Sequence, residues 1–321
     1  MSYERTASLA TLRQRAAMLA AIRSFFAARG VLEVETPALS SAGVTDPAIE
    51  SIIAQARSLA PARQYLHTSP EFAMKRLLAA GSGDAYQLCG VFRDDELGRW
   101  HQPEFTLLEW YRVGWDELAL MTEVAELVAM VCAAAGHTPA TTVRLTYAQA
   151  LEAALGATQE TPTPELAERL AREGIDVPPG LDHDAVLDLA FGTLVVASFD
   201  LGALTFVYDY PASQAALARL KPTTPRVAAR FEAFSWGIEL ANGFHELTDV
   251  AEQRRRFVAE RERRAARDQH VPPLDEQLLR ALASLPDCAG VALGFDRLVA
   301  LATGQDNVAA AMSFAHGRGA E

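Results

Sequence analysis

Apolar residues recur at helical spacing in several long segments of the chain. The clearest periodicity predicts a helix over residues 8–29, with Gly30 as its stop. The residues that carry this pattern are Leu9, Leu12, Ala16, Leu19, Ile22 and Phe26. Similar patterns predict a helix over residues 116–135 and a charged helix over residues 250–268. The stretch from about 140 to 200 is also helical in pattern, is punctuated by prolines, and is interpreted as an insertion.

Shorter segments alternate between apolar and polar residues or are rich in β-branched and aromatic residues, which predicts strands. They cover residues 31–36, 49–54, 65–68, 85–93, 104–112, 204–210, one or two parts of 233–247, and 290–295. Between them, Ser69-Pro70-Glu71 is typical of a helix start, with serine as the cap and proline at the first position. Because the strands are flanked by helices and do not strictly alternate with them, we predict an α+β fold built on an antiparallel β-sheet.

Composition narrows the class of protein. Of the 321 residues, 50% are hydrophobic and 22% are charged, which is typical of a soluble globular protein. The start of the chain carries charges throughout, unlike a signal peptide, and no run is long enough to span a bilayer, so we expect a cytoplasmic protein. The three cysteines and seven histidines show no disulfide or metal-ligand spacing. The net charge of -12 disfavours nucleic acid as a partner.

The first candidate site lies on the strands predicted around residues 85–112. Period-two alternation places Phe105, Leu107, Glu109 and Tyr111 on one face. Such a face could supply a platform for adenine and a pocket for an ammonium group, with Arg93 at the end of the preceding strand as a phosphate ligand. An amphipathic hairpin whose charges face solvent explains the same pattern equally well.

The second candidate is the segment GIELANGFHELTD, residues 237–249. Glu239 and Glu246 are seven residues apart and would face opposite sides of a regular strand. A two-residue hairpin at Asn242-Gly243 or a bulge at Gly243 would bring them to a common face, and two facing carboxylates suit Mg²⁺. Two solvated carboxylates beside an ordinary turn are the simpler alternative, and the residues alone do not choose between hairpin and bulge.

The third candidate is GVALGFDRLVALA, residues 290–302. Gly290, Ala292 and Gly294 share one face of the predicted strand, and small side chains let a ligand approach the backbone closely. Asp296 and Arg297 then open a helix, where arginine is electrostatically unfavourable unless it binds an anion. Close packing beside an exposed arginine is the alternative interpretation.

Taken together and in this order, the segments resemble the class II aminoacyl-tRNA synthetases, specifically the lysyl-tRNA synthetase branch. VLEVETPALS resembles the dimer-forming motif 1, FRDDELGRWHQPEFTLLEWY resembles motif 2, and GVALGFDRL resembles motif 3. HTSPEFAMKRLL and GIELANGFHELTD resemble signatures of the lysine branch. The resemblance implies a single catalytic domain over residues 1–321 with the helical insertion at about 140–200, and a homodimer. A closer resemblance is to elongation factor P–(R)-β-lysine ligases, which are paralogues without the N-terminal anticodon-binding OB-fold.

This resemblance implies a role for each matched residue. Arg93 would bind the α-phosphate of ATP, Phe105 would stack on adenine, and Arg297 would bind the γ-phosphate. The ATP site would be completed by Asp94, Asp95, His101, Gln102, Leu240 and Gly294. Glu239 and Glu246 would hold Mg²⁺ and substrate, with Arg93, Arg297 and Glu239 as the catalytic set. The amino-acid pocket would be lined by Ser69, Pro70, Glu71, Glu109, Tyr111, Glu246 and Ala292.

The sequence departs from the family pattern at three places. Motif 2 reads FRDDE where FRNE is usual, with Asp94 and Asp95, and HQPEF replaces HNPEF, with Gln102. Ala292 stands where lysyl-tRNA synthetases carry glycine, which fits an altered substrate such as a β-amino acid. The resemblance therefore predicts transfer of activated lysine or (R)-β-lysine to elongation factor P. The alternatives are a truncated lysyl-tRNA synthetase that charges tRNA, which the acidic charge disfavours, and a non-catalytic paralogue that binds lysine as a regulator.

Overall fold

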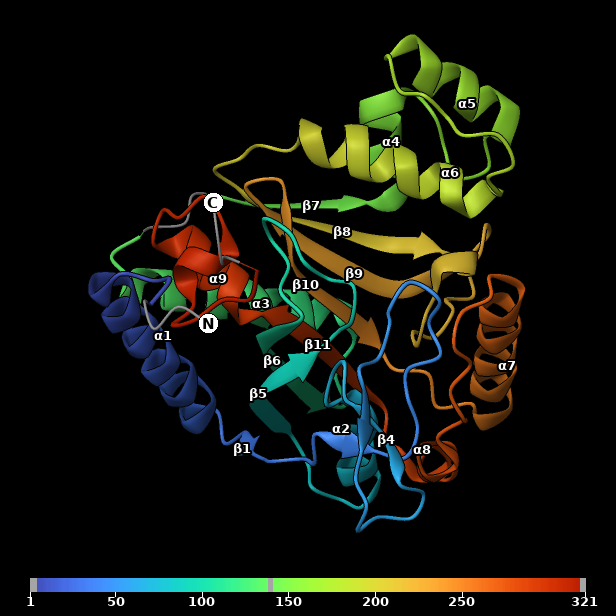
Figure 1. The fold of residues 1–321 in the computed structure, drawn as a ribbon. Helices are drawn as coiled ribbons and strands as arrows, with labels where there is room; N and C mark the ends of the chain where they lie inside the picture. Colours follow the sequence, from blue (N-terminus) through green and yellow to red (C-terminus); the bar gives the residue numbers. More distant parts are fainter. Residues whose placement is uncertain (1–4, 138–140, 318–321) are drawn as a thin grey trace.

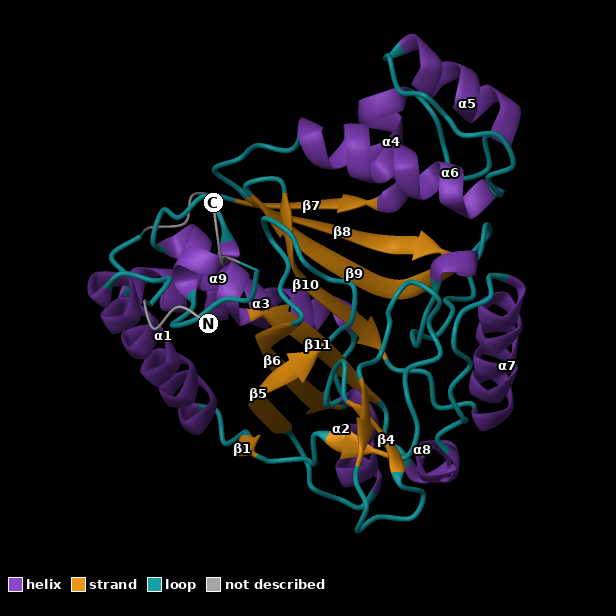
Figure 2. Cartoon of the chain, in the orientation of Figure 1, coloured by secondary structure: helices purple, strands orange, loops and turns teal. Residues whose placement is uncertain are grey.

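An eight-stranded sheet runs through the centre of the molecule and is flanked by helices (Figures 1 and 2). The computed structural model describes residues 5–137 and 141–317. The strands follow the order β1-β5-β6-β11-β10-β9-β8-β7. Their bounds are β1 (Leu32–Glu33), β5 (Ala85–Phe92), β6 (Glu104–Val113), β7 (Thr142–Thr146), β8 (Leu204–Pro211), β9 (Val227–Ser235), β10 (Ile238–His245) and β11 (Cys288–Gly294). The predicted α+β class is confirmed, although the two edge pairs, β1 with β5 and β7 with β8, are parallel.

Helices cover the sheet in three groups. The helices are α1 (Leu9–Ala28), α2 (Glu71–Ala79), α3 (Glu117–Ala134), α4 (Tyr147–Leu155), α5 (Thr163–Arg172), α6 (His183–Ala190), α7 (Val250–Ala266), α8 (Glu276–Ala281) and α9 (Phe295–Ala302). The main core joins α1, α3 and α9 to the central strands, and it includes the fully buried Phe26, Trp110 and Phe295. A second core lies under α4–α6, and a third joins α2, α7 and α8.

A small sheet lies beside α2, in front of the central strands in Figure 1. It is formed by β2 (Leu39–Ser40), β4 (Arg63–Leu66) and β3 (Ile53–Gln55) in that order. The loop between β2 and β3 is anchored to α7, because the buried Arg264 donates hydrogen bonds to the carbonyl oxygens of Asp46 at 2.8 Å and Ile49 at 3.0 Å. This anchoring holds the loop against the open side of the large sheet.

The predicted helices and the central strands lie close to their predicted positions, but three details differ. The strand expected over residues 31–36 is reduced to β1, and strand β7 lies within the stretch expected to be helical. The hairpin at Asn242-Gly243 is wrong, because both residues lie inside the continuous strand β10. Gly243 serves close packing there, since a Cβ at this position would lie 2.4 Å from Cζ of Phe231. Strand β10 does shift its pairing register with β9, but the shift lies between Glu239 and Ala241 and not at Gly243.

Among the described residues, no helix is long and apolar enough to cross a membrane. The segments that carried the candidate chemistry all converge on one side of the large sheet. Strands β6, β11, β10 and β9 form the floor of this region, and α2 and the loops of the small sheet form its wall.

Candidate active site

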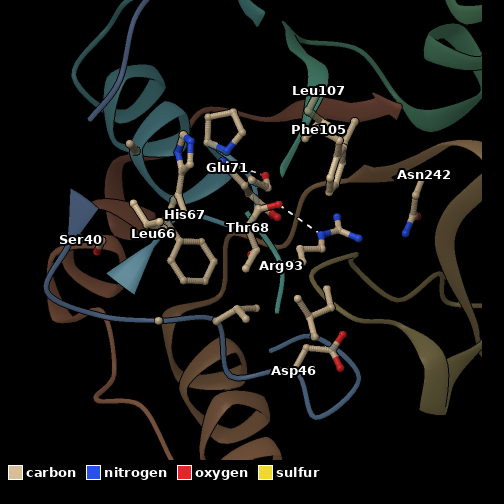
Figure 3. A pocket seen from close by; sticks show the side chains of 18 of the residues that line it. Ser40, Asp46, Leu66, His67, Thr68, Glu71, Arg93, Phe105, Leu107 and Asn242 are labelled. Atoms are coloured by element: carbon tan, nitrogen blue, oxygen red, sulfur yellow. Dashed lines mark hydrogen bonds between the residues drawn. The ribbon is translucent and has the colours of Figure 1, made fainter. Parts of the chain in front are cut away.

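A cavity of about 740 Å³ opens between the central strands, α2 and the loops of the small sheet. Most of the residues predicted for the site line it together. These are Ser69, Pro70, Glu71, Arg93, His101, Gln102, Phe105, Glu239, Leu240, Ala292, Gly294 and Arg297. Figure 3 shows Arg93 near the centre of this cavity, with Phe105, Thr68 and Glu71 around it.

Two arginines mark one end of the cavity. The guanidinium carbon of Arg93 lies 5.1 Å from the centre of the Phe105 ring, and its Nε donates to the carbonyl oxygen of Thr68 at 3.4 Å. Arg297, in the first turn of α9, donates to the carbonyl oxygens of Glu239 at 2.8 Å and Trp100 at 3.1 Å. These backbone contacts fix the planar donor groups, which suit phosphate oxygens.

His101 supports the position of Arg297. The guanidinium Nη2 of Arg297 donates to Nε2 of His101 at 2.8 Å. Burial and the neighbouring Arg297 lower the pKa of His101, so the imidazole is neutral and accepts this hydrogen bond. A neutral imidazole here orients the arginine without adding positive charge.

Strand β9 contributes two polar residues that sequence reasoning missed, Arg230 and Glu232. Both line the cavity and form an ion pair with each other. Arg230 also donates to the carbonyl oxygen of Gln214 at 2.8 Å and to Oδ1 of Asn242 at 3.3 Å. Their alternation within the strand sequence ARFEAF was the available signal, because it places both side chains on one face.

Glu239 belongs with Glu232 and not with Glu246. Protein atoms surround Glu239 on most sides, and the 42% of its side chain that is exposed borders the cavity. Burial, followed by the nearby Glu232, raises the pKa of Glu239 to about 7. Two carboxylates that repel each other at the edge of a cavity are suited to a cation between them.

The prediction that Glu239 and Glu246 share one Mg²⁺ is wrong. Seven residues of extended strand separate them by roughly 20 Å, and no hairpin folds the strand back. Glu246 instead forms an ion pair with Lys75. Among the residues that the structure describes, no group of three or more His, Cys, Asp or Glu side chains forms a metal cluster. The pair Glu232 and Glu239 nevertheless fits Mg²⁺, which in nucleotide sites uses one or two carboxylates together with phosphate oxygens and water.

The other end of the site is rich in carboxylates. Glu109 is buried in the wall and accepts hydrogen bonds from Ser69 Oγ at 2.5 Å and from the Tyr111 hydroxyl at 2.8 Å. Ser69 in turn accepts a hydrogen bond from the backbone N–H of Glu71 at 3.0 Å. Burial, followed by the charge of Glu71, raises the pKa of Glu109 to about 8. These contacts hold Glu109 rigidly beside the cavity.

Lys75, which sequence reasoning also missed, lies behind this wall. Its Nζ is 2.5 Å from Oε1 of Glu71 and 2.6 Å from Oε2 of Glu246. Burial opposes its charge, but Glu246 and Glu71 outweigh burial and raise the pKa of Lys75. Burial also raises the pKa of Glu246 to about 7. The spacing of Glu71 and Lys75, four apart on a predicted helix, was the signal that could have found this pair.

The small residues of β11 form the floor between the two ends. Ala292 pairs with Glu109 in the sheet register, and Gly294 pairs with Leu107. Gly290 pairs with Tyr111, and a Cβ on Gly290 would lie 2.2 Å from the Tyr111 ring. Of the three small residues, Ala292 and Gly294 therefore line the cavity, whereas the space above Gly290 is filled by Tyr111 and Glu246.

Five of the predicted residues do not line the cavity. Glu109, Tyr111 and Glu246 are buried in its wall. Asp94 and Asp95 are exposed on the loop after β5, where the Asp94 backbone N–H donates to the Glu50 carbonyl oxygen at 2.9 Å. These two aspartates therefore lie outside the cavity, whereas Glu96 of the same loop lines it.

Comparison with known proteins gives concordant results. The family model of class II tRNA synthetases (D, K and N) matches residues 1–318. The chain is 48% identical over 312 residues to an elongation factor P–(R)-β-lysine ligase from Vibrio cholerae, which covers 94% of each chain. It is 47% identical to the ligase of the same name from Pseudoalteromonas translucida, over 96% of each chain. It is 46% identical to that from Salmonella dublin, over 98% of this chain and 97% of the relative.

Proposed function

The chain belongs to the class II tRNA synthetase family (D, K and N), and from this membership we propose that it is an ATP-dependent ligase for elongation factor P. The enzyme activates (R)-β-lysine or lysine as an aminoacyl-adenylate. It then transfers the aminoacyl group to the ε-amino group of a lysine on elongation factor P. Because this acceptor is a translation factor, the reaction takes place in the cytoplasm.

One observation carries the proposal: a single cavity has arginines at one end and a surplus of carboxylates at the other. Arginine donors suit the phosphates of ATP, and buried carboxylates suit the ammonium groups of a diamino acid. The carboxylate of the amino acid then lies between its own ammonium groups and the α-phosphate. This is the arrangement that adenylate formation requires.

The reaction proceeds in two displacements. A carboxylate oxygen of the amino acid attacks the α-phosphorus of ATP, and the bond to pyrophosphate breaks. Arg93 stabilises the charge that develops on the α-phosphate, Phe105 stacks on adenine, and Arg297 binds the γ-phosphate. The acceptor amine then attacks the adenylate carbonyl, loses a proton, and displaces AMP, which leaves an amide bond.

The remaining predicted residues support these groups. Gln102, Leu240 and Gly294 border the nucleotide end, while Ser69, Glu71, Glu109 and Tyr111 form the amine end. Glu232 and Glu239 would hold Mg²⁺, which supplies positive charge to neutralise the phosphates. A homodimer follows from the resemblance of residues 31–40 to motif 1 and is part of the proposal.

The test uses purified protein, ATP and either lysine isomer, with elongation factor P or bulk tRNA as acceptor. We expect intact-mass spectrometry to show one added lysyl group on elongation factor P and no lysyl ester on tRNA. The Arg93→Ala variant is the matched negative control, because it retains the amine pocket. Aminoacylation of tRNA alone would overturn the proposed acceptor, and absence of lysine-dependent pyrophosphate exchange would overturn the proposed chemistry.

A further inference from the structure

A cation that belongs to the protein lies behind the amine end of the cavity. Lys75 is 1% exposed and contacts Glu71 and Glu246 at 2.5 and 2.6 Å, yet it does not border the cavity itself. Three carboxylates, including Glu109, surround this one ammonium group. When all four groups are ionised, the cluster keeps a surplus of two negative charges.

The contacts of Lys75 leave one oxygen of each partner available. Glu71 uses Oε1 and Glu246 uses Oε2 for Lys75. Glu71 borders the cavity, and Oε1 of Glu246 lies 2.6 Å from where a Cβ of Gly290 would be. The free oxygen of Glu246 therefore faces the small-residue floor of β11. Lys75 lies behind the cavity lining, where it links the cavity-lining Glu71 to the buried Glu246 and fixes the position of both carboxylates.

We propose that Lys75 is a built-in counter-ion that positions Glu71 and Glu246 and sets the charge of the pocket for a substrate with two ammonium groups. This inference rests on the proposed function and deepens it by naming what selects the substrate. Lys75 neutralises one of the three negative charges, and the two ammonium groups of the substrate neutralise the other two. A substrate with one ammonium group leaves an uncompensated charge in a buried site, which is costly.

Removing Lys75 also changes the behaviour of its partners. Carboxylates that lie close together without a cation hold on to their protons more strongly. Glu246, whose pKa burial already raises to about 7, would then be largely protonated at neutral pH and would contribute less negative charge to the binding of an ammonium group. Glu71 would lose the ion pair that holds its side chain in place. Lys75 thus acts on the substrate through these two side chains and is a positioning residue.

The experiment compares Lys75→Met with Lys221→Met. Methionine has a similar length and no charge, so it fits the buried space. Lys221 is the matched control, because its ammonium group also contacts two carboxylates, Glu117 and Asp209, but lies outside the cavity. Lysine-dependent pyrophosphate exchange is measured for both variants as a function of pH. Binding of 1,5-diaminopentane and of pentylamine to each protein is measured by calorimetry.

We expect Lys75→Met to raise KM for lysine by about tenfold or more, with KM for ATP changed by less than about threefold. The acid limb of the kcat/KM profile should move to higher pH, and Lys221→Met should match the wild type. The wild type should bind 1,5-diaminopentane at least about tenfold more tightly than pentylamine, and Lys75→Met should lose this preference. Propylammonium should restore lysine affinity to a Lys75→Ala variant, whereas the uncharged propanol should not.

Three results would overturn the inference. They are an unchanged KM and pH profile in Lys75→Met, an equal loss of lysine and ATP affinity, or rescue by propanol as good as that by propylammonium. If neither variant at Lys75 folds, equal binding of the two amines by the wild type overturns it. Absence of exchange activity in the wild type would instead refute the proposed function, and the amine-binding comparison would still test the pocket.

Discussion

Adding a single methyl group at Gly290 should damage the amine end of the cavity selectively. The Cβ of a Gly290→Ala variant would lie 2.2 Å from Cε1 of Tyr111 and 2.6 Å from Oε1 of Glu246. Carbon atoms in contact are about 3.5–4.0 Å apart, so the Tyr111 ring must move by about 1.3 Å or more. Its hydroxyl then loses the 2.8 Å hydrogen bond to Glu109.

The size of the effect follows from these contacts. Overpacking of a buried site costs about 1–3 kcal/mol, and a hydrogen bond contributes about 0.5–1.5 kcal/mol net. If about 2–3 kcal/mol of this falls on substrate binding, the affinity for lysine drops by about 30- to 150-fold. The arginine end is four residues away along β11, so KM for ATP should change little.

Steady-state pyrophosphate exchange with varied lysine and varied ATP measures both constants. Gly90→Ala on β5 is the matched control, because a Cβ there meets nothing closer than a Glu104 carboxylate oxygen at 3.8 Å. An unchanged KM for lysine in Gly290→Ala would refute the packing argument. An equal increase of both KM values would refute the division of the cavity into two ends.

Three further predictions concern charge. Burial raises the pKa of Glu109 to about 8 and that of Glu246 to about 7. Between about pH 4.5 and 8 the folded protein without ligand therefore binds more protons at these two groups than the unfolded chain does. Their contribution should raise the melting temperature of the free protein as pH falls from 8 to 6, while KM for lysine rises. Arg264→Met should lower the free energy of unfolding by about 3–5 kcal/mol in urea titrations, because it leaves three backbone carbonyl oxygens without their buried donor and the half-buried Glu50 without its partner. The exposed Arg255→Met should cost less than about 1 kcal/mol. Arg93→Ala should abolish pyrophosphate exchange and retain the thermal shift caused by lysine, and loss of that shift would show unfolding instead.

The sequence predicted those parts of the fold that depend on local periodicity. The helix over residues 8–29 and the strands around residues 85–112 follow from spacing alone, because one face of each must be buried. The side chains of Phe105 and Arg93 meet in the structure, as their positions on adjacent strands suggested. The helical character of the stretch from about 140 to 200 was also recognisable, although the edge strand β7 was not. That strand pairs in parallel with a segment about sixty residues later in the chain, which no local pattern reveals.

The errors in the predicted site arose because long-range packing decides the conformation of residues 237–249. Asn242-Gly243 is a common turn sequence, but tertiary contacts override it here because Phe231 needs the space above Gly243. Both a hairpin at Asn242-Gly243 and a bulge at Gly243 would have paired Glu239 with Glu246, and the structure has neither. The real neighbour of Glu239, Glu232, sits on the adjacent strand, and only the register of β9 against β10 brings the two together.

Strand β11 explains why one cavity can serve two opposite charges. Gly290 lies at the carboxylate end, Ala292 lies opposite Glu109, and Gly294 lies beside Arg297. Four residues of strand span about 13 Å, which is enough for an extended diamino acid to run from its ammonium groups to the phosphate. Because Ala292 and Gly294 are small and line the cavity, the ligand can lie along the backbone there, while Gly290 makes room for the Tyr111 ring and the Glu246 carboxylate. The spacing along this strand therefore sets the distance between the reacting carboxylate and the amine end of the cavity. Ala292 lies between the two ends and is the only one of the three residues with a side chain, so a change of substrate length must be accommodated there.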